Sequence, residues 1–142
     1  MRSQIRLNIP LLFACTGIIV IVVGLFMKSV LEIQFYDTYF IASQKIIAVY
    51  ACGTMEVSAL VYLTLNKIGK YVSANLSLVH YAMTVFSSVI LLTVPFFNNL
   101  SDDLALWEIV SMTVLAAVSA FVLGQFALII NVIQSLLRNK QR

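Results

Sequence analysis

Lys45, Glu56 and His80 stand inside otherwise apolar stretches of this 142-residue sequence. A charge in a hydrocarbon environment costs about 2.5 to 3.5 kcal/mol even on permissive scales, so such residues are usually paired or belong to a proton or ion pathway. Lys45 and Glu56 are eleven residues apart, so they share a helix face but lie about 16 Å apart along the helix axis. The spacing therefore predicts a separate partner for each.

Lys45 and Glu56 each allow two interpretations. Lys45 lies near the start of a predicted helix, so it either extends to the membrane surface or pairs with Glu108. The alternative is that Lys45 contacts another subunit. Glu56 is either a protonated carboxyl in a contact between helices or part of a proton or cation path.

The composition places these side chains in an integral membrane protein. Hydrophobic residues make up 61% and charged residues 11% of the chain, with a mean hydropathy of +0.99, whereas soluble domains are about 25% charged. None of the apolar stretches alternates as membrane β-strands do, so we predict an all-α fold, a single transmembrane domain over residues 1–142. Four stretches reach the length of about 20 residues that crosses a bilayer: 9–27, 40–65, 76–97 and 104–137.

The cationic side chains predict the orientation of this four-helix bundle. With four spans, seven of the nine lysines and arginines share one side: Arg2, Arg6, Lys67, Lys70, Arg138, Lys140 and Arg142. The positive-inside rule then puts both ends of the chain inside, an N-in/C-in topology. The short basic segment before the first span favours a multi-pass protein of the cell inner membrane, with the mitochondrial inner membrane as the alternative. The net charge of +3 follows from this topology and gives no reason to expect nucleic acid as a partner.

Local signals predict the limits of the helices. Asp37 or Thr38 would cap the start of the second helix, and Gly69 between two lysines would end it. Gly17 and Gly24 are seven residues apart on one side of the first helix, where small residues allow another helix to approach closely.

The segment before the second helix carries a resemblance. Residues 31–43 read LEIQFYDTYFIAS, which resembles the start of a heme-binding helix in heme-copper oxidase subunit I, the core subunit of cytochrome c and quinol oxidases. VHYA at residues 79–82 is similar to the Ile-His-Phe-Ala that opens the penultimate helix of that family, and Trp107 sits where a tryptophan starts the last helix. The resemblance implies the fold of the last four helices of that subunit over nearly the whole chain.

The heme ligands of that family are missing from this sequence. Gln44 occupies the position of the high-spin heme's proximal histidine, and Ile46 occupies that of the low-spin heme's ligand. Tyr36 replaces the histidine that helps to bind magnesium, so Asp37 alone remains of that set. His80, the single histidine, cannot supply a bis-histidine heme or a multi-histidine copper site, and we expect it to be a hydrogen-bonded residue near the membrane surface. The alternative is a heme shared by paired His80 residues of two protomers.

A retained motif without its ligands predicts a noncatalytic membrane subunit rather than an enzyme, with no cofactor and no metal. The expected partners are other membrane subunits of a terminal oxidase or a larger respiratory complex. The alternatives are a free-standing small transporter or proton-conducting protein that uses Glu56, and a quinone or heme binder. The candidate functional residues are Asp37, Lys45, Glu56, His80 and Glu108.

Overall fold

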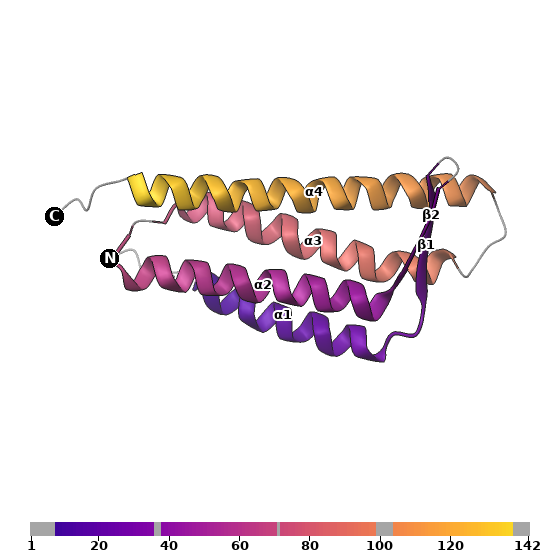
Figure 1. Ribbon diagram of the computed structural model, residues 1–142, viewed down its shortest axis with the longest axis horizontal. Coiled ribbons are helices and arrows are strands. Elements are labelled where there is room, and N and C mark those ends of the chain that lie inside the picture. The colour runs from indigo at the N-terminus through magenta and orange to yellow at the C-terminus, as the bar shows by residue number, and fades with distance from the viewer. Residues whose placement is uncertain (1–7, 36–37, 71, 99–103, 138–142) are drawn as a thin grey trace, which may run out of the picture.

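Four long helices make up most of the computed structural model, which describes residues 8–35, 38–70, 72–98 and 104–137. They run alternately in opposite directions (Figure 1). Each is long and apolar enough to cross a membrane, which confirms the helical bundle and its four candidate spans. The elements in chain order are α1 (Ile9–Phe26), β1 (Val30–Phe35), β2 (Thr38–Ser43), α2 (Gln44–Lys67), α3 (Ala74–Asn98) and α4 (Leu104–Leu137).

The antiparallel hairpin of β1 and β2 is the main departure from the predicted fold. Its register pairs Val30 with Ser43 and Phe35 with Thr38. From Leu31 to Phe35, apolar and polar residues alternate along β1 (VLEIQF), which is the period of a strand, and β-branched and aromatic side chains favour that conformation. The all-α prediction is therefore wrong for residues 30–35 and 38–43, and the second helix begins at residue 44 rather than at 40.

The start of α2 differs from the predicted start, whereas its end agrees with the predicted end. The predicted cap at its start is wrong, because Thr38 lies in β2 and Ser43 caps the helix by accepting a hydrogen bond from the Ile46 N–H at 3.3 Å. Asp37 lies outside the described residues. The predicted end is confirmed, since Gly69 adopts a positive φ of 68° that favours glycine, and the Lys70 N–H donates to the Leu65 carbonyl.

The helices pack as two pairs, α1 along α2 and α3 along α4. At least one glycine lies in the contact within each pair. A Cβ atom at Gly24 would collide with the Cβ of Ala48 on α2, and one at Gly124 on α4 would lie 3.2 Å from the Cβ of Met83 on α3. Gly17 is also buried against α2. The close approach predicted from Gly17 and Gly24 is confirmed, and Gly124 serves the second pair in the same way.

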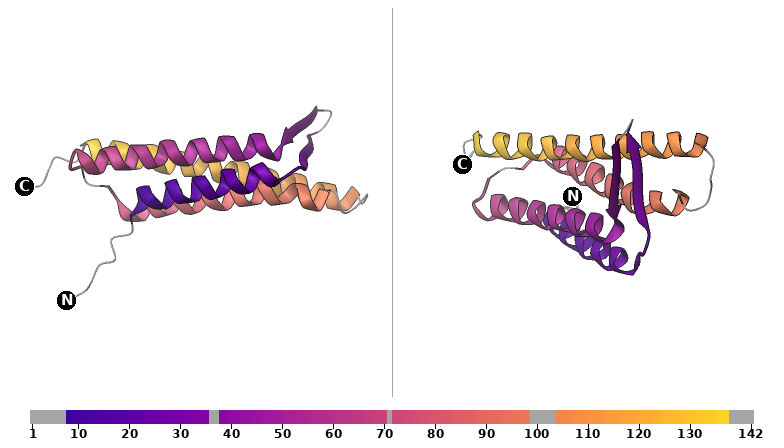
Figure 2. Two further views of the ribbon diagram at one scale, coloured as in Figure 1. Left: turned by 90° about the horizontal axis from the view of Figure 1, so that it is seen from below. Right: turned by 45° about the vertical axis from the view of Figure 1, so that its right-hand side comes forward.

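The hairpin joins the two helix pairs at one end of the bundle. It begins at the end of α1, returns to the start of α2, and runs across α3 to α4 (Figures 1 and 2). Leu31 of β1 is buried in a cluster with Val94 of α3 and with Val110 and Val114 of α4. At the opposite end lie the starts of α1 and α3 and the ends of α2 and α4 (Figure 1).

We predict that Gly24→Val lowers the free energy of unfolding in detergent by about 1 to 3 kcal/mol, because the added side chain would force α1 away from Ala48. The matched control is Gly53→Ala in α2. No atom lies within 4 Å of a Cβ built at Gly53, so this variant should be as stable as the native chain or slightly more stable. Equal stability of Gly24→Val and the native chain would contradict the packing described for α1 and α2.

Candidate functional site

Buried polar side chains form a row along one face of α3. Their spacing follows the helical period, so they share a face, and each is at most 1% exposed. The face is directed toward the interior of the bundle, where neighbouring helices supply the hydrogen-bond partners. We call these residues the polar row: Ser77, His80, Thr84, Ser87 and Ser88.

His80 lies at the centre of the bundle's polar interior and is fully buried. Its Nδ1 shares a hydrogen bond of 3.1 Å with the hydroxyl of Tyr62 on α2, and its ring lies 4.8 Å from the ring of Phe13 on α1. Gln125 of α4 lies beside the ring. His80 Nε2 is buried without a hydrogen-bond partner among the described residues. The hydrogen bond expected of His80 is present, and four helices meet around this side chain.

Asn131 of α4 connects the polar row with the start of α3. Its Oδ1 accepts from the Ser73 N–H at 3.0 Å, and its Nδ2 donates to the Ser73 carbonyl at 3.2 Å and to the Ser77 hydroxyl at 2.9 Å. The Tyr62 hydroxyl lies beside the side chains of both Ser77 and Asn131. Because all of these groups are amides or hydroxyls, they form a continuous hydrogen-bonding region from the end of the bundle to His80.

Gln44 has the corresponding role at the end of the bundle that carries the hairpin. Its Nε2 donates to the Leu92 carbonyl of α3 at 2.7 Å, and its Oε1 accepts from the Ser29 N–H at 3.1 Å. Pro95 lies inside α3 and has no N–H, so the helical hydrogen bonding is interrupted beside Leu92. Gln44 is fully buried and links the segment before β1, the start of α2 and α3.

Gln44 and Ile46, the two positions that the resemblance to the oxidase family aligns with heme ligands, differ in environment. Gln44 is used inside the bundle, whereas Ile46 faces outward with 53% of its surface exposed. Among the described residues, no group of three or more histidine, cysteine, aspartate or glutamate side chains lies close enough to hold a metal ion.

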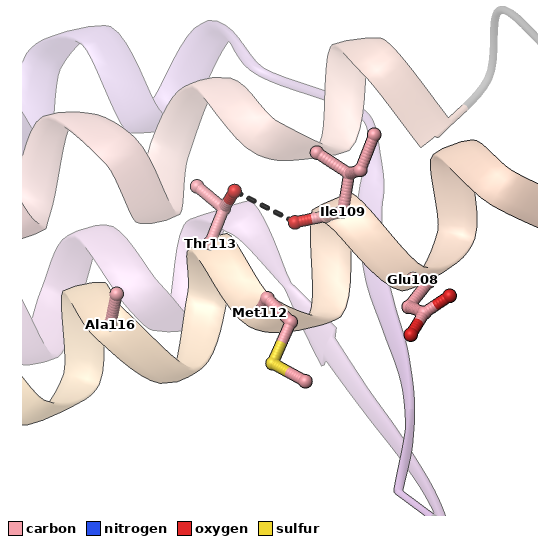
Figure 3. A pocket seen from close by; sticks show the side chains of 5 residues that line it. All are labelled: Glu108, Ile109, Met112, Thr113 and Ala116. Atoms are coloured by element: carbon pink, nitrogen blue, oxygen red, sulfur yellow. Dashed lines mark hydrogen bonds between the residues drawn. The ribbon is translucent and has the colours of Figure 1, made fainter.

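Lys45 and Glu108 do not form the predicted pair. Both side chains are exposed, and no ion pair joins them in the part of the chain that the structure describes. Glu108 borders a shallow, open depression on α4 whose other lining residues are Ile109, Met112, Thr113 and Ala116 (Figure 3). The Thr113 hydroxyl there donates to the Ile109 carbonyl at 2.8 Å, so it is not free to donate to Glu108.

Glu56 lies between α1 and α2, apart from the polar row. Its side chain is partly buried, and its Oε1 has no hydrogen-bond partner among the described residues. The neighbouring hydroxyls do not serve it, because Thr54 donates to the Tyr50 carbonyl and Ser58 donates to the Thr54 carbonyl. A Cβ atom at Gly17 would lie 2.9 Å from Glu56 Oε1, so glycine makes room for this carboxyl.

The sequence analysis identified His80 but missed the residues that surround it. Tyr62, Gln125 and Asn131 belong to three different turns of two other helices, and no local spacing relates them to His80. The polar row itself left a signal, since serine, threonine and histidine recur at helical spacing in an otherwise apolar span.

Comparisons with protein-family models, with curated proteins and with solved structures find no match for this chain. Its function is therefore inferred from its residues and their geometry.

We predict that Gln44→Leu lowers the free energy of unfolding in detergent by about 1 to 3 kcal/mol, because it removes the side-chain partners of the Ser29 N–H and the Leu92 carbonyl. Gln134→Leu on the exposed face of α4 is the control and should change stability by about 0.5 kcal/mol or less. Equal losses in the two variants would show that Gln44 has no special role in joining the elements.

Proposed function

We propose that this chain is a noncatalytic membrane subunit that packs against other transmembrane helices of a respiratory oxidase assembly. The observation that carries the proposal is the side of α2 where exposed Lys45 and Gly53 adjoin Glu56, whose carboxyl lies at the border with α1 and is only partly covered by this chain. We call these three residues the outward face. Within a bilayer such a face is costly against lipid and is stabilised by a partner helix.

Glu56 is the strongest argument for a partner. It is the thirteenth of the 24 residues of α2 and lies about 17 Å from either helix end, too far for its side chain to reach water. One carboxyl oxygen is buried without a partner among the described residues, and the side chain is only partly covered by this chain. A hydrogen-bond donor on a neighbouring helix would satisfy this carboxyl.

Gly53 supports the same interpretation. It is exposed, and no atom of the chain lies within 4 Å of a Cβ built on it. A glycine on the surface of a membrane helix lets the backbone of another helix approach closely. Lys45 lies two turns earlier near the hairpin end, where an acidic group of a partner or the membrane surface would receive its charge.

The resemblance of residues 31–43 to oxidase subunit I supports an oxidase assembly as the partner. The noncatalytic role is supported by the two ligand positions. Gln44 makes its side-chain hydrogen bonds inside the bundle, and Ile46 lies on the outer surface. Neither residue type binds heme iron in the way that histidine does.

In the proposed orientation, the chain is a multi-pass protein of the cell inner membrane, and both of its ends lie in the cytoplasm. Lys67 and Lys70 lie at the end of the bundle that holds the starts of α1 and α3 and the ends of α2 and α4 (Figure 1). The positive-inside rule assigns this end to the cytoplasmic side.

Purification of the tagged full chain from its native membranes in a mild detergent tests the proposal, with mass spectrometry of the bound proteins and an absorption spectrum for heme. We expect stoichiometric oxidase subunits and a heme spectrum contributed by them. Recovery of the chain alone, under conditions that keep the oxidase intact, would contradict the proposal.

We predict that Gly53→Leu reduces the recovered partner by about tenfold, equivalent to about 1.4 kcal/mol, because the new side chain holds the partner helix away from α2. The isolated chain should keep its stability, since the position is open. Ala82→Leu, a similar enlargement by three carbons rather than four on the exposed face of α3, is the matched control and should retain the partner. Loss of the partner in both variants would mean that the outward face of α2 is not the contact.

A further inference from the structure

The polar row and the polar groups that adjoin its two ends together extend across the apolar length of the bundle. From Ser73 to Leu92 along α3 is a step of nineteen residues, about 28 Å in a helix, which is close to the hydrocarbon thickness of about 30 Å. At one end Ser73 is half-buried next to Asn131, and at the other end Gln44 joins Leu92 to the half-buried Ser29. Polar groups therefore reach from one end of the bundle to the other.

The hydroxyls of the row keep their acceptor sites available. Ser77, Ser87 and Ser88 each donate to a carbonyl of their own helix one turn earlier, at 2.6 to 2.9 Å. A hydroxyl has two lone pairs besides its proton, so each can still accept a hydrogen bond. Side chains one turn apart are about 5 to 6 Å from each other, a gap that a single water spans with two hydrogen bonds of about 2.8 Å.

His80 differs from the other members of the row because it can both take and release a proton. Its Nε2 is buried and makes no hydrogen bond of ordinary geometry among the described residues, and the Gln125 side chain lies beside the ring. The groups around the ring are Tyr62 from α2, Phe13 from α1 and Gln125 from α4, and Tyr81 follows on α3 with its hydroxyl bonded to Thr16. None of these groups is charged, so no fixed charge traps a proton at the ring.

We propose that the polar row is a proton path across the membrane and that His80 is its relay. Tyr62 passes its hydroxyl proton to Nδ1 of His80 and receives one from the Ser77 hydroxyl, which is resupplied by water at the Ser73 end. The ring releases its other proton from Nε2 toward Thr84, and the hydroxyls of Ser87 and Ser88 with their bridging waters lead it to the Gln44 end. Each serine hydroxyl turns away from its own-helix carbonyl while it passes a proton on. One proton enters and one leaves, so every group ends with the number of protons it had, and His80 returns to its starting tautomer before the next proton.

This activity is independent of the proposed assembly with an oxidase. It also differs from a path through Glu56, since the polar row does not include that carboxyl, which lies against Gly17 between α1 and α2. One experiment tests whether proton transfer occurs without an oxidase and whether it needs Glu56.

The full chain is reconstituted in liposomes that enclose a pH-sensitive dye, and a potassium gradient with valinomycin supplies the driving force and the compensating charge. We expect proton entry clearly faster than in protein-free vesicles. His80→Gln keeps a hydrogen-bonding side chain but cannot carry the proton, and should lower the rate by about 100-fold, the low end of the contribution of a positioned proton-transfer group. Tyr62→Phe keeps the ring that stacks on Phe13 and should lower the rate in the same direction.

Two controls make the result decisive. Ser119→Ala on the exposed face of α4 and Glu56→Gln should both keep the native rate. A native rate equal to that of protein-free vesicles overturns the proposal, as do native rates in both His80→Gln and Tyr62→Phe. Loss of flux in Glu56→Gln alone moves the path to that carboxyl and overturns it too. If His80→Gln loses its helical content, the folded Tyr62→Phe variant decides between these outcomes.

Discussion

The hydrogen bonds of Gln44 determine how the two helix pairs meet at the hairpin end of the bundle. One side chain serves the Ser29 N–H before β1 and the Leu92 carbonyl of α3 while it begins α2. Gln44 is fully buried and Ser29 is half-buried, so a partner within the chain stabilises each of these backbone groups. The hairpin therefore ends where Gln44 can reach α3, and Leu31 comes to lie between α3 and α4.

Polar groups are divided between the inside and the outside of the bundle, and the two sets have different consequences. The inner set, from Asn131 through His80 to Gln44, has its hydrogen bonds within the chain apart from one ring nitrogen among the described residues. The second, outer set is the exposed Lys45 and, at the border of α1 and α2, Glu56, whose Oε1 has no hydrogen-bond partner among the described residues. The inner set supports transfer of a proton, and the outer set supports contact with a neighbouring helix.

The differences between prediction and structure have physical causes in particular residues. Residues 40–43 are apolar and adjoin the second span, so hydropathy alone assigned them to the helix, whereas pairing with β1 holds them in a strand. The pair of Lys45 and Glu108 was predicted from depth alone. The rotation of α2 and α4 about their axes leaves both side chains exposed and unjoined in the described structure. The position of a residue in the sequence sets its depth in the bundle, whereas helix packing sets the direction in which its side chain points.

Apolar stretches of this length must satisfy their backbone hydrogen bonds internally, so hydropathy alone predicts four helices long enough to cross a membrane. The helical period also relates the residues of the polar row to one face of α3. Which of these side chains meet those of other helices cannot be predicted in this way. Tyr62 and His80 are separated by 18 residues, Gln44 and Leu92 by 48, and Ser73 and Asn131 by 58. Their contacts depend on the rotation and register of the helices, which close packing at Gly24 and Gly124 fixes through atoms that no local pattern relates.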